Sequence, residues 1–322
     1  MDMKKSLLGG LILAACTTQT FALNVLISND DGLTSNIKAL YEQLKADGHS
    51  VVVSVPCSAQ SGRSGAIVMY STRTIDAAND QQITNESGCH NGAAAIGAPA
   101  AGVFTKAGYT NGDWNYVHGT PVMATAYGID VVAQNRWGKA PDLVLSGPNE
   151  GQNVGKLVIH SGTIGNVQYA AGRGIPAIAL SADTNTVDDQ ALNNANSAIV
   201  AKQTSVLLNE LQRKAVQGKL LPNGVTLNVN FPKTLTTSTP FAFSKIGSYD
   251  LYSLKFKVGS DAQGSTYGIG GSLASAKPSE SQMTDESLVA QSKIAVTAMQ
   301  VAYDQGLAAQ EWLKIRLKAL FQ

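Results

Sequence analysis

The chain opens with an apolar pattern that changes from strand-like to helix-like and back. Residues 24–28 have an apolar centre and are followed by a polar, glycine-containing loop, which is typical of a buried parallel strand. Residues 37–44 then place apolar side chains at helical intervals, and Thr34 or Ser35 stands where a helix cap is expected. Residues 51–55 are a second β-branched run. This order predicts a β-α-β unit with parallel strands and a right-handed crossover.

The same alternation continues through the middle of the chain. Further strands are predicted at residues 142–146, 177–181 and 225–231. Helices are predicted to begin at Thr120-Pro121 and at Ser161-Gly-Thr163, and a long one is predicted over residues 188–215. Because strands and helices alternate, the fold class expected is α/β, a doubly wound, mostly parallel sheet in a Rossmann-type three-layer core.

The C-terminal third follows a different pattern. Residues 232–283 are rich in Ser, Thr, Gly and Lys with weak periodicity, which predicts a hairpin or arm off the core, with a flexible loop as the alternative. Residues 293–300 alternate as a strand does. Leu313, Leu317 and Leu320 share one helix face, so a closing amphipathic helix is expected to pack on the core or on another subunit rather than to anchor a membrane. We therefore expect one domain over residues 23–322, with its core over about 23–231.

The first residues indicate targeting. Lys4 and Lys5 precede an apolar stretch, residues 6–15, that is too short to span a bilayer, and small residues follow at a suitable cleavage position. Residues 1–22 are therefore predicted to be a signal peptide of an exported, periplasmic or secreted protein. The run that ends at Cys16 also resembles a lipoprotein processing site, which leaves a lipid anchor as an alternative, and a buried first element is a third interpretation.

Charge and cysteine content narrow the functional classes. The 24 basic and 23 acidic residues nearly cancel, so the sequence favours neither a surface for duplex nucleic acid nor a polybasic membrane patch, and it predicts no transmembrane span. Cys57 and Cys89 would remain after export. In an oxidising compartment they could form a disulfide, but two unpaired thiols are equally consistent with the sequence.

Polar residues collect in the loops that follow the predicted strands. These loops comprise Asn29 to Gly32, Gln60 to Gly65, Gly147 to Asn153 and His160 to Thr163. Ligands of open α/β sheets bind outside the carboxyl ends of the strands. We therefore expect these four loops to share one edge of the sheet and to form the site.

The loop after the first strand contains two adjacent aspartates. Asp30 and Asp31 would repel each other in a buried turn, and no lysine or arginine lies nearby in the sequence. A divalent cation would relieve this repulsion, and oxygen ligands favour Mg²⁺ or Mn²⁺, with Ca²⁺ as an alternative and zinc disfavoured. Taken alone, the aspartates are also compatible with an ordinary turn.

The start of the helix at Ser161 to Thr163 is a second candidate. Free N–H groups at a helix start bind anions, although Ser-Gly-Thr is also a common cap. A metal beside a phosphate would activate water, so the two loops together predict hydrolysis of a phosphate ester. A nicotinamide cofactor is disfavoured, because the turn after the first strand is acidic and lacks Gly-x-Gly-x-x-Gly.

These motifs resemble the SurE family of survival proteins, which are 5′/3′-nucleotidases and acid phosphatases. The likeness is carried by Val25 to Gly32, Pro56 to Gly62, Gly119 to Pro121, Pro141 to Asn153, Ser161 to Pro176 and Thr284-Asp285. The Ser-Asn-Asp-Asp-Gly and Ser-Gly-x-Asn-x-Gly-x-Asn motifs are specific when they occur in this order. The resemblance covers essentially all of the chain after the predicted signal peptide.

The resemblance implies a role for each motif residue. One divalent cation per subunit would be held by Asp30, Asp31, Ser61 and Asn149, with Asp30 also the candidate general base. The phosphate and nucleotide would contact Asn29, Asn153, Ser161, Gly162 and Thr163. Ser64, in a second Ser-Gly pair, competes with Ser61 for the ligand position. A homodimer or homotetramer with an exchanged C-terminal arm is also implied.

The sequence departs from the common family pattern at several positions. Val122-Met123 follows Pro121 where an acidic residue is frequent, Tyr169 replaces a frequent Glu, and Cys57 replaces a frequent Asp. His160 replaces a frequent aromatic residue, and it either donates a proton to the leaving group or packs at a strand end. The expected activity is hydrolysis of nucleoside monophosphates. The alternatives are a broad acid phosphatase or polyphosphatase, and a non-catalytic nucleotide-binding relative.

Overall fold

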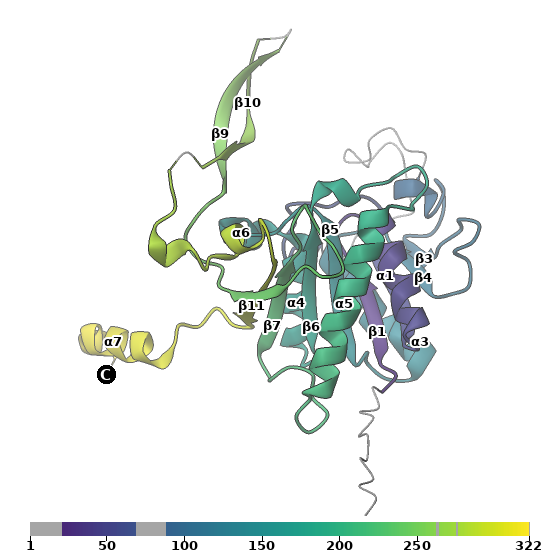
Figure 1. The fold of residues 1–322 in the computed structure, drawn as a ribbon, viewed down its shortest axis with the longest axis horizontal. Helices are drawn as coiled ribbons and strands as arrows, with labels where there is room; N and C mark the ends of the chain where they lie inside the picture. The colour runs from purple at the N-terminus through teal and green to yellow at the C-terminus, as the bar shows by residue number, and fades with distance from the viewer. Residues whose placement is uncertain (1–20, 69–87, 262–263, 275, 322) are drawn as a thin grey trace, which may run out of the picture.

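The computed structural model describes residues 21–68, 88–261, 264–274 and 276–321, and its centre is one nine-stranded sheet (Figure 1). The strand order is β3-β4-β2-β1-β5-β6-β7-β11-β8. The strands are β1 (Asn24–Ser28), β2 (Ser50–Pro56), β3 (Ala101–Val103), β4 (Trp114–Val117), β5 (Leu143–Glu150), β6 (Ala177–Ala182), β7 (Val225–Asn230), β8 (Phe241–Ser244) and β11 (Ile294–Gln300). From β4 to β7 all neighbours are parallel, and the pairs β3–β4 and β11–β7 are antiparallel. The predicted mostly parallel sheet is confirmed.

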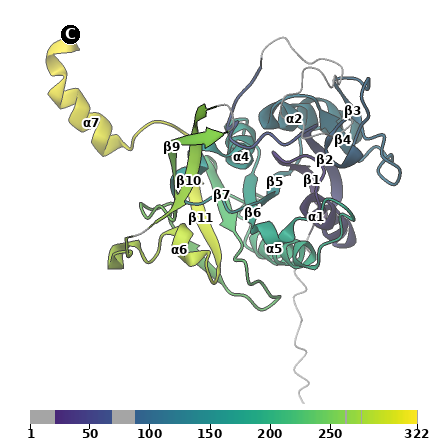
Figure 2. The same ribbon diagram turned by 90° about the horizontal axis from the view of Figure 1, so that it is seen from above.

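Helices cover both faces of this sheet, which gives the three predicted layers (Figure 2). One face carries α1 (Ser35–Ala46) and α5 (Ala195–Arg213), and the other carries α2 (Pro121–Tyr127) and α4 (Gly162–Gly172). The short α3 (Ala133–Trp137) lies on the second face too, since Trp137 packs against the same cluster as α4. The alternation of side chains along β1 explains why: Val25 and Ile27 join the hydrophobic cluster beneath α1 and α5, whereas Leu26 joins the cluster beneath α4.

Helix starts follow the predicted caps, with one correction. Thr34, Thr120 and Ser161 each accept an N–H bond at the start of their helices. The helix predicted over 188–215 instead begins at Ala195, because the Asp188 carboxylate accepts backbone N–H bonds from the residues that follow it. Such local bonds favour a turn over a helix.

The segment after β7 is partly sheet and partly arm. β8 joins the edge of the main sheet, which the sequence analysis did not predict. β9 (Tyr252–Asp261) and β10 (Gly264–Leu273) form the expected hairpin, which rises away from the core (Figure 1). Two short helices, η5 (Glu280–Gln282) and α6 (Glu286–Val289), lead back to β11.

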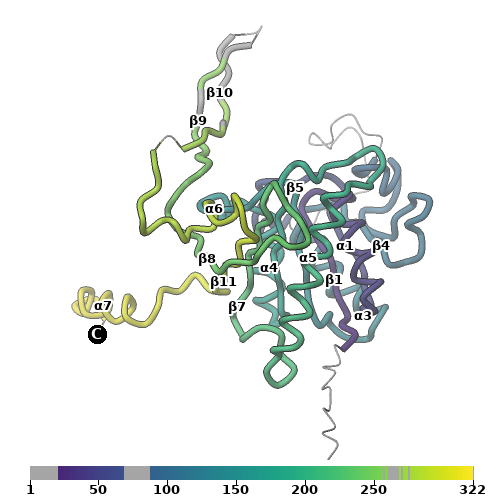
Figure 3. The backbone as a smooth tube through the Cα atoms, viewed as in Figure 1, coloured from purple at the N-terminus to yellow at the C-terminus, as the bar shows by residue number. Residues whose placement is uncertain are grey.

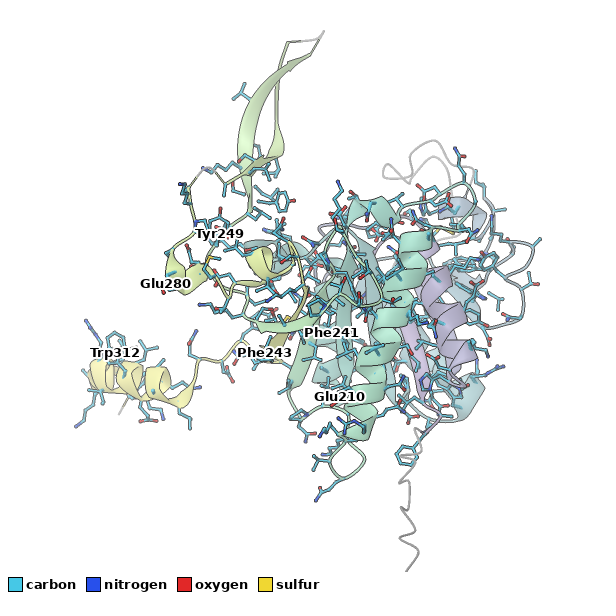
Figure 4. All side chains as sticks on the ribbon, in the orientation of Figure 1. Glu210, Phe241, Phe243, Tyr249, Glu280 and Trp312 are labelled. Carbon is cyan, nitrogen blue, oxygen red and sulfur yellow. A yellow bond between two sulfur atoms is a disulfide. The ribbon has the colours of Figure 1, made fainter. Side chains whose placement is uncertain are left out.

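The closing helix α7 (Leu307–Arg316) stands off the body, as the tube in Figure 3 makes clear. It has no buried residue, so the option that it packs on its own core is wrong. Trp312 is 55% exposed and lies far from the labelled Phe241 and Phe243 of the sheet edge (Figure 4). Packing on another subunit stays a prediction.

Three further expectations concern the leader, a membrane span and the two cysteines. The predicted signal peptide, with Cys16, falls almost wholly within residues 1–20, which lie outside the described residues. Among the helices that are described, none is long and apolar enough to cross a bilayer. Cys57 and Cys89 are joined in a disulfide, which answers the question that the sequence left open.

Candidate active site

The turn after β1 brings the two aspartates to the carboxyl edge of the sheet. Asn29 shapes this turn, because its Oδ1 accepts a bond from the Gly32 N–H (3.1 Å) and its Nδ2 donates to the Gly32 carbonyl (2.7 Å). Gly32 has a φ of +87°, and a Cβ there would lie 3.1 Å from the Pro56 carbonyl oxygen, so glycine is required. Asn29, predicted to contact substrate, therefore has both polar side-chain groups engaged within the turn.

Asp30 lies against the start of α4. Its Oδ1 accepts a hydrogen bond from Thr163 Oγ1 at 2.7 Å. The approach is close because residue 162 is a glycine, where a Cβ would lie only 2.7 Å from Asp30 Cβ. Burial raises the pKa of the Asp30 carboxyl, and bonds from Thr163 and from the backbone of Gly162 partly offset this rise. The start of α4, which the sequence predicted to bind a phosphate, therefore lies against the Asp30 carboxylate.

Asp31 faces the end of β5. Its Oδ2 accepts a bond from the Glu150 N–H at 3.2 Å. Its pKa is raised well above the ordinary value, first by burial and then by the negative charges of Asp30 and Glu150. Two adjacent carboxylates are thus held together in the interior, as the sequence predicted.

The end of β5 adds oxygen atoms that have no hydrogen-bond partner. The β5–β6 register shifts between Ser146 and Asn149, and such an irregularity re-aims the side chains that follow it. Asn149 donates from Nδ2 to the Gly151 carbonyl (2.7 Å), while its Oδ1 is buried and unpartnered. Glu150 Oε1 is also buried and unpartnered, and burial raises the pKa of Glu150 to about 7.

The predicted phosphate residues form a connected chain with Asp30. Asn153 Nδ2 donates to Ser181 Oγ (2.9 Å) and to Thr163 Oγ1 (3.4 Å), which in turn donates to Asp30. Ser161 Oγ accepts the Ile164 N–H and so caps α4. The structure therefore brings Asn153, Thr163 and Asp30 together, with Ser161 and Gly162 at the same helix start.

The loop after β2 lies beside these groups. The Gln60 N–H donates to the Asp30 carbonyl (2.7 Å). This bond ties the loop to residues 29–33, here called the acid turn, and the exposed Ser61 is next along the chain. The Ser64 N–H donates to the carbonyl of His160 (3.2 Å), so the second serine faces the segment before α4. His160 itself is exposed. The choice between Ser61 and Ser64 as a ligand stays a prediction.

Sequence reasoning missed three residues at this edge besides Glu150. His90 Nε2 lies 3.3 Å from Asp189 Oδ1, and Asn91 Nδ2 donates to the same oxygen at 3.1 Å. Asn91 Nδ2 also donates to the Leu33 carbonyl at 2.8 Å, at the end of the acid turn. These contacts link segments far apart in the chain, and nothing in the local sequence predicts them.

The donor set fits a hard divalent cation. Two buried carboxylates with raised pKa values and the unpartnered amide oxygen of Asn149 are oxygen ligands of the kind that Mg²⁺, Mn²⁺ and Ca²⁺ take. Within the described ranges no group of three or more His, Cys, Asp and Glu side chains is arranged to hold a metal. A cation here would therefore need amide or hydroxyl ligands to complete its shell.

Comparison with known proteins places these features in a family. The model of a family described as Survival protein SurE matches residues 25–251. An acid phosphatase of Yarrowia lipolytica is 35% identical over 215 residues, which cover 65% of this chain and 56% of that protein. A 5′-nucleotidase SurE of Methanocella arvoryzae is 32% identical over 227 residues, which cover 69% of this chain and 71% of that protein.

The fold has a counterpart among solved structures. The crystal structure of the SurE protein from Aquifex aeolicus superposes with a TM-score of 0.63 at 22% identity, covering 91% of this chain and 98% of that one. At this level of identity the superposition establishes the fold alone. It agrees with the three-layer arrangement described above.

Proposed function

The chain belongs to the SurE family, and we propose that it is a metal-dependent phosphomonoester hydrolase, a 5′-nucleotidase that releases phosphate from nucleoside monophosphates. The observation that carries the proposal is the meeting of Asp30 with the start of α4 and of Asp31 with the end of β5, where the neighbouring Asn149 Oδ1 is buried without a partner. The relatives named 5′-nucleotidase and acid phosphatase support the same reaction class.

The cation would be held by Asp30, Asp31 and Asn149, with Ser61 as the further ligand. We propose one Mg²⁺ or Mn²⁺ per subunit, with Ca²⁺ as the weaker alternative, because all these ligands are oxygens. A bound divalent cation lowers the pKa of a coordinated water and offsets negative charge on the phosphate.

The protein's own groups position the general base, Asp30, and the phosphate. Thr163 Oγ1 fixes the orientation of the Asp30 carboxylate, and Asn153 in turn orients Thr163. Asp30 takes the proton from the attacking water, a role that its position favours because Thr163 holds its carboxylate at the start of α4. The dipole at the start of α4 favours the anionic phosphate beside Gly162.

The test is phosphate release by the mature protein, residues 23–322, from AMP and from an aryl phosphate. Each is assayed with EDTA, Mg²⁺ or Mn²⁺, beside Asp30→Asn and the control Asp304→Asn, which changes an exposed aspartate of the linker to α7. We expect metal-dependent release that Asp30→Asn abolishes and Asp304→Asn leaves intact. Nucleotide binding without release under any metal would overturn the proposal and favour a non-catalytic binding protein.

A second candidate differs only in substrate range. The relative from Yarrowia lipolytica is named an acid phosphatase, which favours a broad phosphatase or polyphosphatase activity. Equal kcat/KM for AMP and the aryl phosphate would support the broad enzyme. A preference for AMP of about tenfold or more would support the nucleotidase.

We further propose a homodimer or homotetramer in which the arm and α7 pack on a second copy. The exposed apolar side chains of α7, with Trp312 55% and Ile315 75% exposed, favour this, because such a face is seldom left in water. Light scattering on the mature protein and on a version ending at residue 304 tests it. We expect a smaller assembly for the shortened chain, and equal masses corresponding to monomers would contradict the proposal.

The proposed compartment is periplasmic or extracellular. The leader pattern of residues 1–22 and the Cys57–Cys89 disulfide favour export to an oxidising environment. Cell fractionation with the intact leader and with Cys16→Ala distinguishes the two forms. A membrane-bound protein that the Cys16→Ala change releases would indicate the lipid anchor instead of free export.

A further inference from the structure

The disulfide lies directly beside the acid turn. Cys57 follows the last residue of β2, and Cys89 precedes the short helix η1 (His90–Gly92). Both cysteines are only 1% exposed. The bond therefore joins two short loop segments inside the protein, at the same sheet edge as Asp30 and Asp31.

The Cys57 segment supports the turn from one side. Gly32 packs so closely on it that an added Cβ would lie 3.1 Å from the Pro56 carbonyl oxygen and 3.6 Å from that of Cys57. Three residues after Cys57, the Gln60 N–H donates to the Asp30 carbonyl at 2.7 Å. This segment thus fixes the backbone that carries the first aspartate.

The Cys89 segment supports the turn from its other end. The His90 N–H donates to the Cys57 carbonyl (2.7 Å), and Asn91 Nδ2 donates to the Leu33 carbonyl (2.8 Å). Lys106 Nζ holds this segment in place by donating to the Asn91 carbonyl (2.8 Å). Residues 30–33 are therefore bracketed by two segments that one covalent bond joins.

From this placement we propose that the Cys57–Cys89 disulfide is a positioning element of the metal site, so that cation affinity depends on the oxidised bond. The inference rests on the proposed function, because it assumes that the acid turn binds a divalent cation. η1 has only three residues. Such short elements open locally at low cost, and opening would release the Asn91 contact to the turn.

The test measures binding of Mn²⁺ alone to the metal-free mature protein by calorimetry, before and after reduction with dithiothreitol. Dithiothreitol becomes its cyclic disulfide as two protein thiols form, and thiol titration confirms this exchange. We expect the dissociation constant to rise about tenfold on reduction, the lower end of what loss of outer supports costs a metal site. A constant within twofold of the oxidised value, with two titrated thiols and unchanged circular dichroism, would overturn the proposal.

A paired substitution separates positioning from general loosening. Asn91→Gly removes the amide at a residue whose φ is +53°, so glycine adopts the backbone without strain. Gln217→Gly makes the same kind of change at φ +51° in an exposed loop that follows α5. We expect weaker Mn²⁺ binding only for Asn91→Gly. Equal constants for the two variants would contradict the proposal.

These measurements also separate this proposal from the enzyme hypothesis. If the oxidised protein binds Mn²⁺ but releases no phosphate, the proposed function fails while the redox comparison still decides the role of the disulfide. If phosphate release is metal-dependent and the affinity for Mn²⁺ does not respond to reduction, only the role of the disulfide fails.

Discussion

Two pairs of adjacent acidic residues are buried in the part of the chain that the structure describes, and their surroundings differ. Asp30 and Asp31 follow β1, whereas Asp285 and Glu286 lie at the start of α6. The exposed fraction is 3% and 8% for the first pair and 0% for both members of the second. Burial alone therefore does not distinguish a functional pair from a structural one.

The difference lies in the hydrogen-bond donors around each pair. Asp285 Oδ2 accepts two backbone N–H bonds, from residues 248 and 249, both at 2.8 Å, and its Oδ1 lies 3.4 Å from Lys245 Nζ. Glu286 likewise accepts a bond at each of its carboxylate oxygens. Asp285 Oδ1 has no hydrogen-bond donor, but the Lys245 ammonium offsets its charge. The second pair ties the base of the arm to the core.

The first pair is less evenly supplied. Asp30 accepts bonds from Thr163 Oγ1 and from the backbone of Gly162, whereas Asp31 accepts one bond, from the Glu150 N–H. At the end of β5, Asn149 Oδ1 and Glu150 Oε1 are buried without a partner. A buried oxygen atom without a hydrogen-bond donor lowers the stability of the folded protein unless a ligand binds to it. Asp285 is compensated by the Lys245 charge and two backbone donors, whereas Asp31 has one donor. We infer that this difference in compensation, rather than burial alone, marks the pair that serves a cation.

The largest expected effect is on catalysis at the first pair. Asp31→Asn should lower kcat by about 10³-fold at saturating metal, because it removes a carboxylate that would hold the cation that stabilises the charge of the transition state. In EDTA the same variant should unfold at a higher temperature than the wild type, because it removes a buried charge that repels Asp30. Phosphate release and thermal unfolding measure the two effects. A variant that keeps a tenth of the activity would contradict the assignment.

The opposite outcome is expected at the second pair. Asp285→Ala leaves the N–H groups of residues 248 and 249 without their acceptor, so the free energy of unfolding should fall by about 3–4 kcal/mol. Mn²⁺ affinity should stay within twofold, because no acid-turn ligand is touched. Urea denaturation and calorimetry give these values, with Asp304→Ala as the exposed control. A loss of metal affinity without a loss of stability would erase the distinction between the two pairs.

Glu286 provides a pH-dependent form of the comparison. Burial is the first cause that raises its pKa from 4.5 to about 7, so the folded protein keeps a proton that the unfolded chain has released. Its stabilising contribution is therefore complete below about pH 4.5 and is lost as the pH rises through 7.

The expected loss across this window is at most about 3 kcal/mol. Other buried acids titrate in the same window, so the measurement is the difference between wild type and Glu286→Gln in EDTA. Urea unfolding at several pH values should give a steeper decline for the wild type. Parallel declines would show that Glu286 is not protonated in the folded protein.

Sequence reasoning succeeded where the signal is local. The strand before Asp30 and the caps at Thr34, Thr120 and Ser161 depend on residues within one turn of chain, and the carboxyl-edge rule then brings their loops together. The motif residues that meet across the sheet, such as Thr163 and Asp30, were found for this reason.

The failures concern contacts between distant segments. Glu150 was overlooked because its meeting with Asp31 spans 119 positions of sequence, and Asn91 meets Asp189 across 98. The apolar spacing in α7 was correctly helical, but periodicity does not say which surface a helix packs against. In the described structure no residue of α7 is buried. The edge strand β8 was missed because four residues carry too short a pattern.

The smallest expected effect concerns the serine ligand of the cation, for which the sequence offers both Ser61 and Ser64. Ser61 stands beside Gln60, whose N–H holds the Asp30 carbonyl, whereas Ser64 has a φ of +48° and its N–H meets His160 across the loop. Ser61→Ala should weaken Mn²⁺ binding by about fivefold, or roughly 1 kcal/mol, since a single neutral ligand is lost. Ser64→Gly, which suits the left-handed backbone, should leave the dissociation constant unchanged. Calorimetry on both variants measures the Mn²⁺ dissociation constant. A higher constant for Ser64→Gly alone would make Ser64 the ligand and would place the expected cation nearer the start of α4.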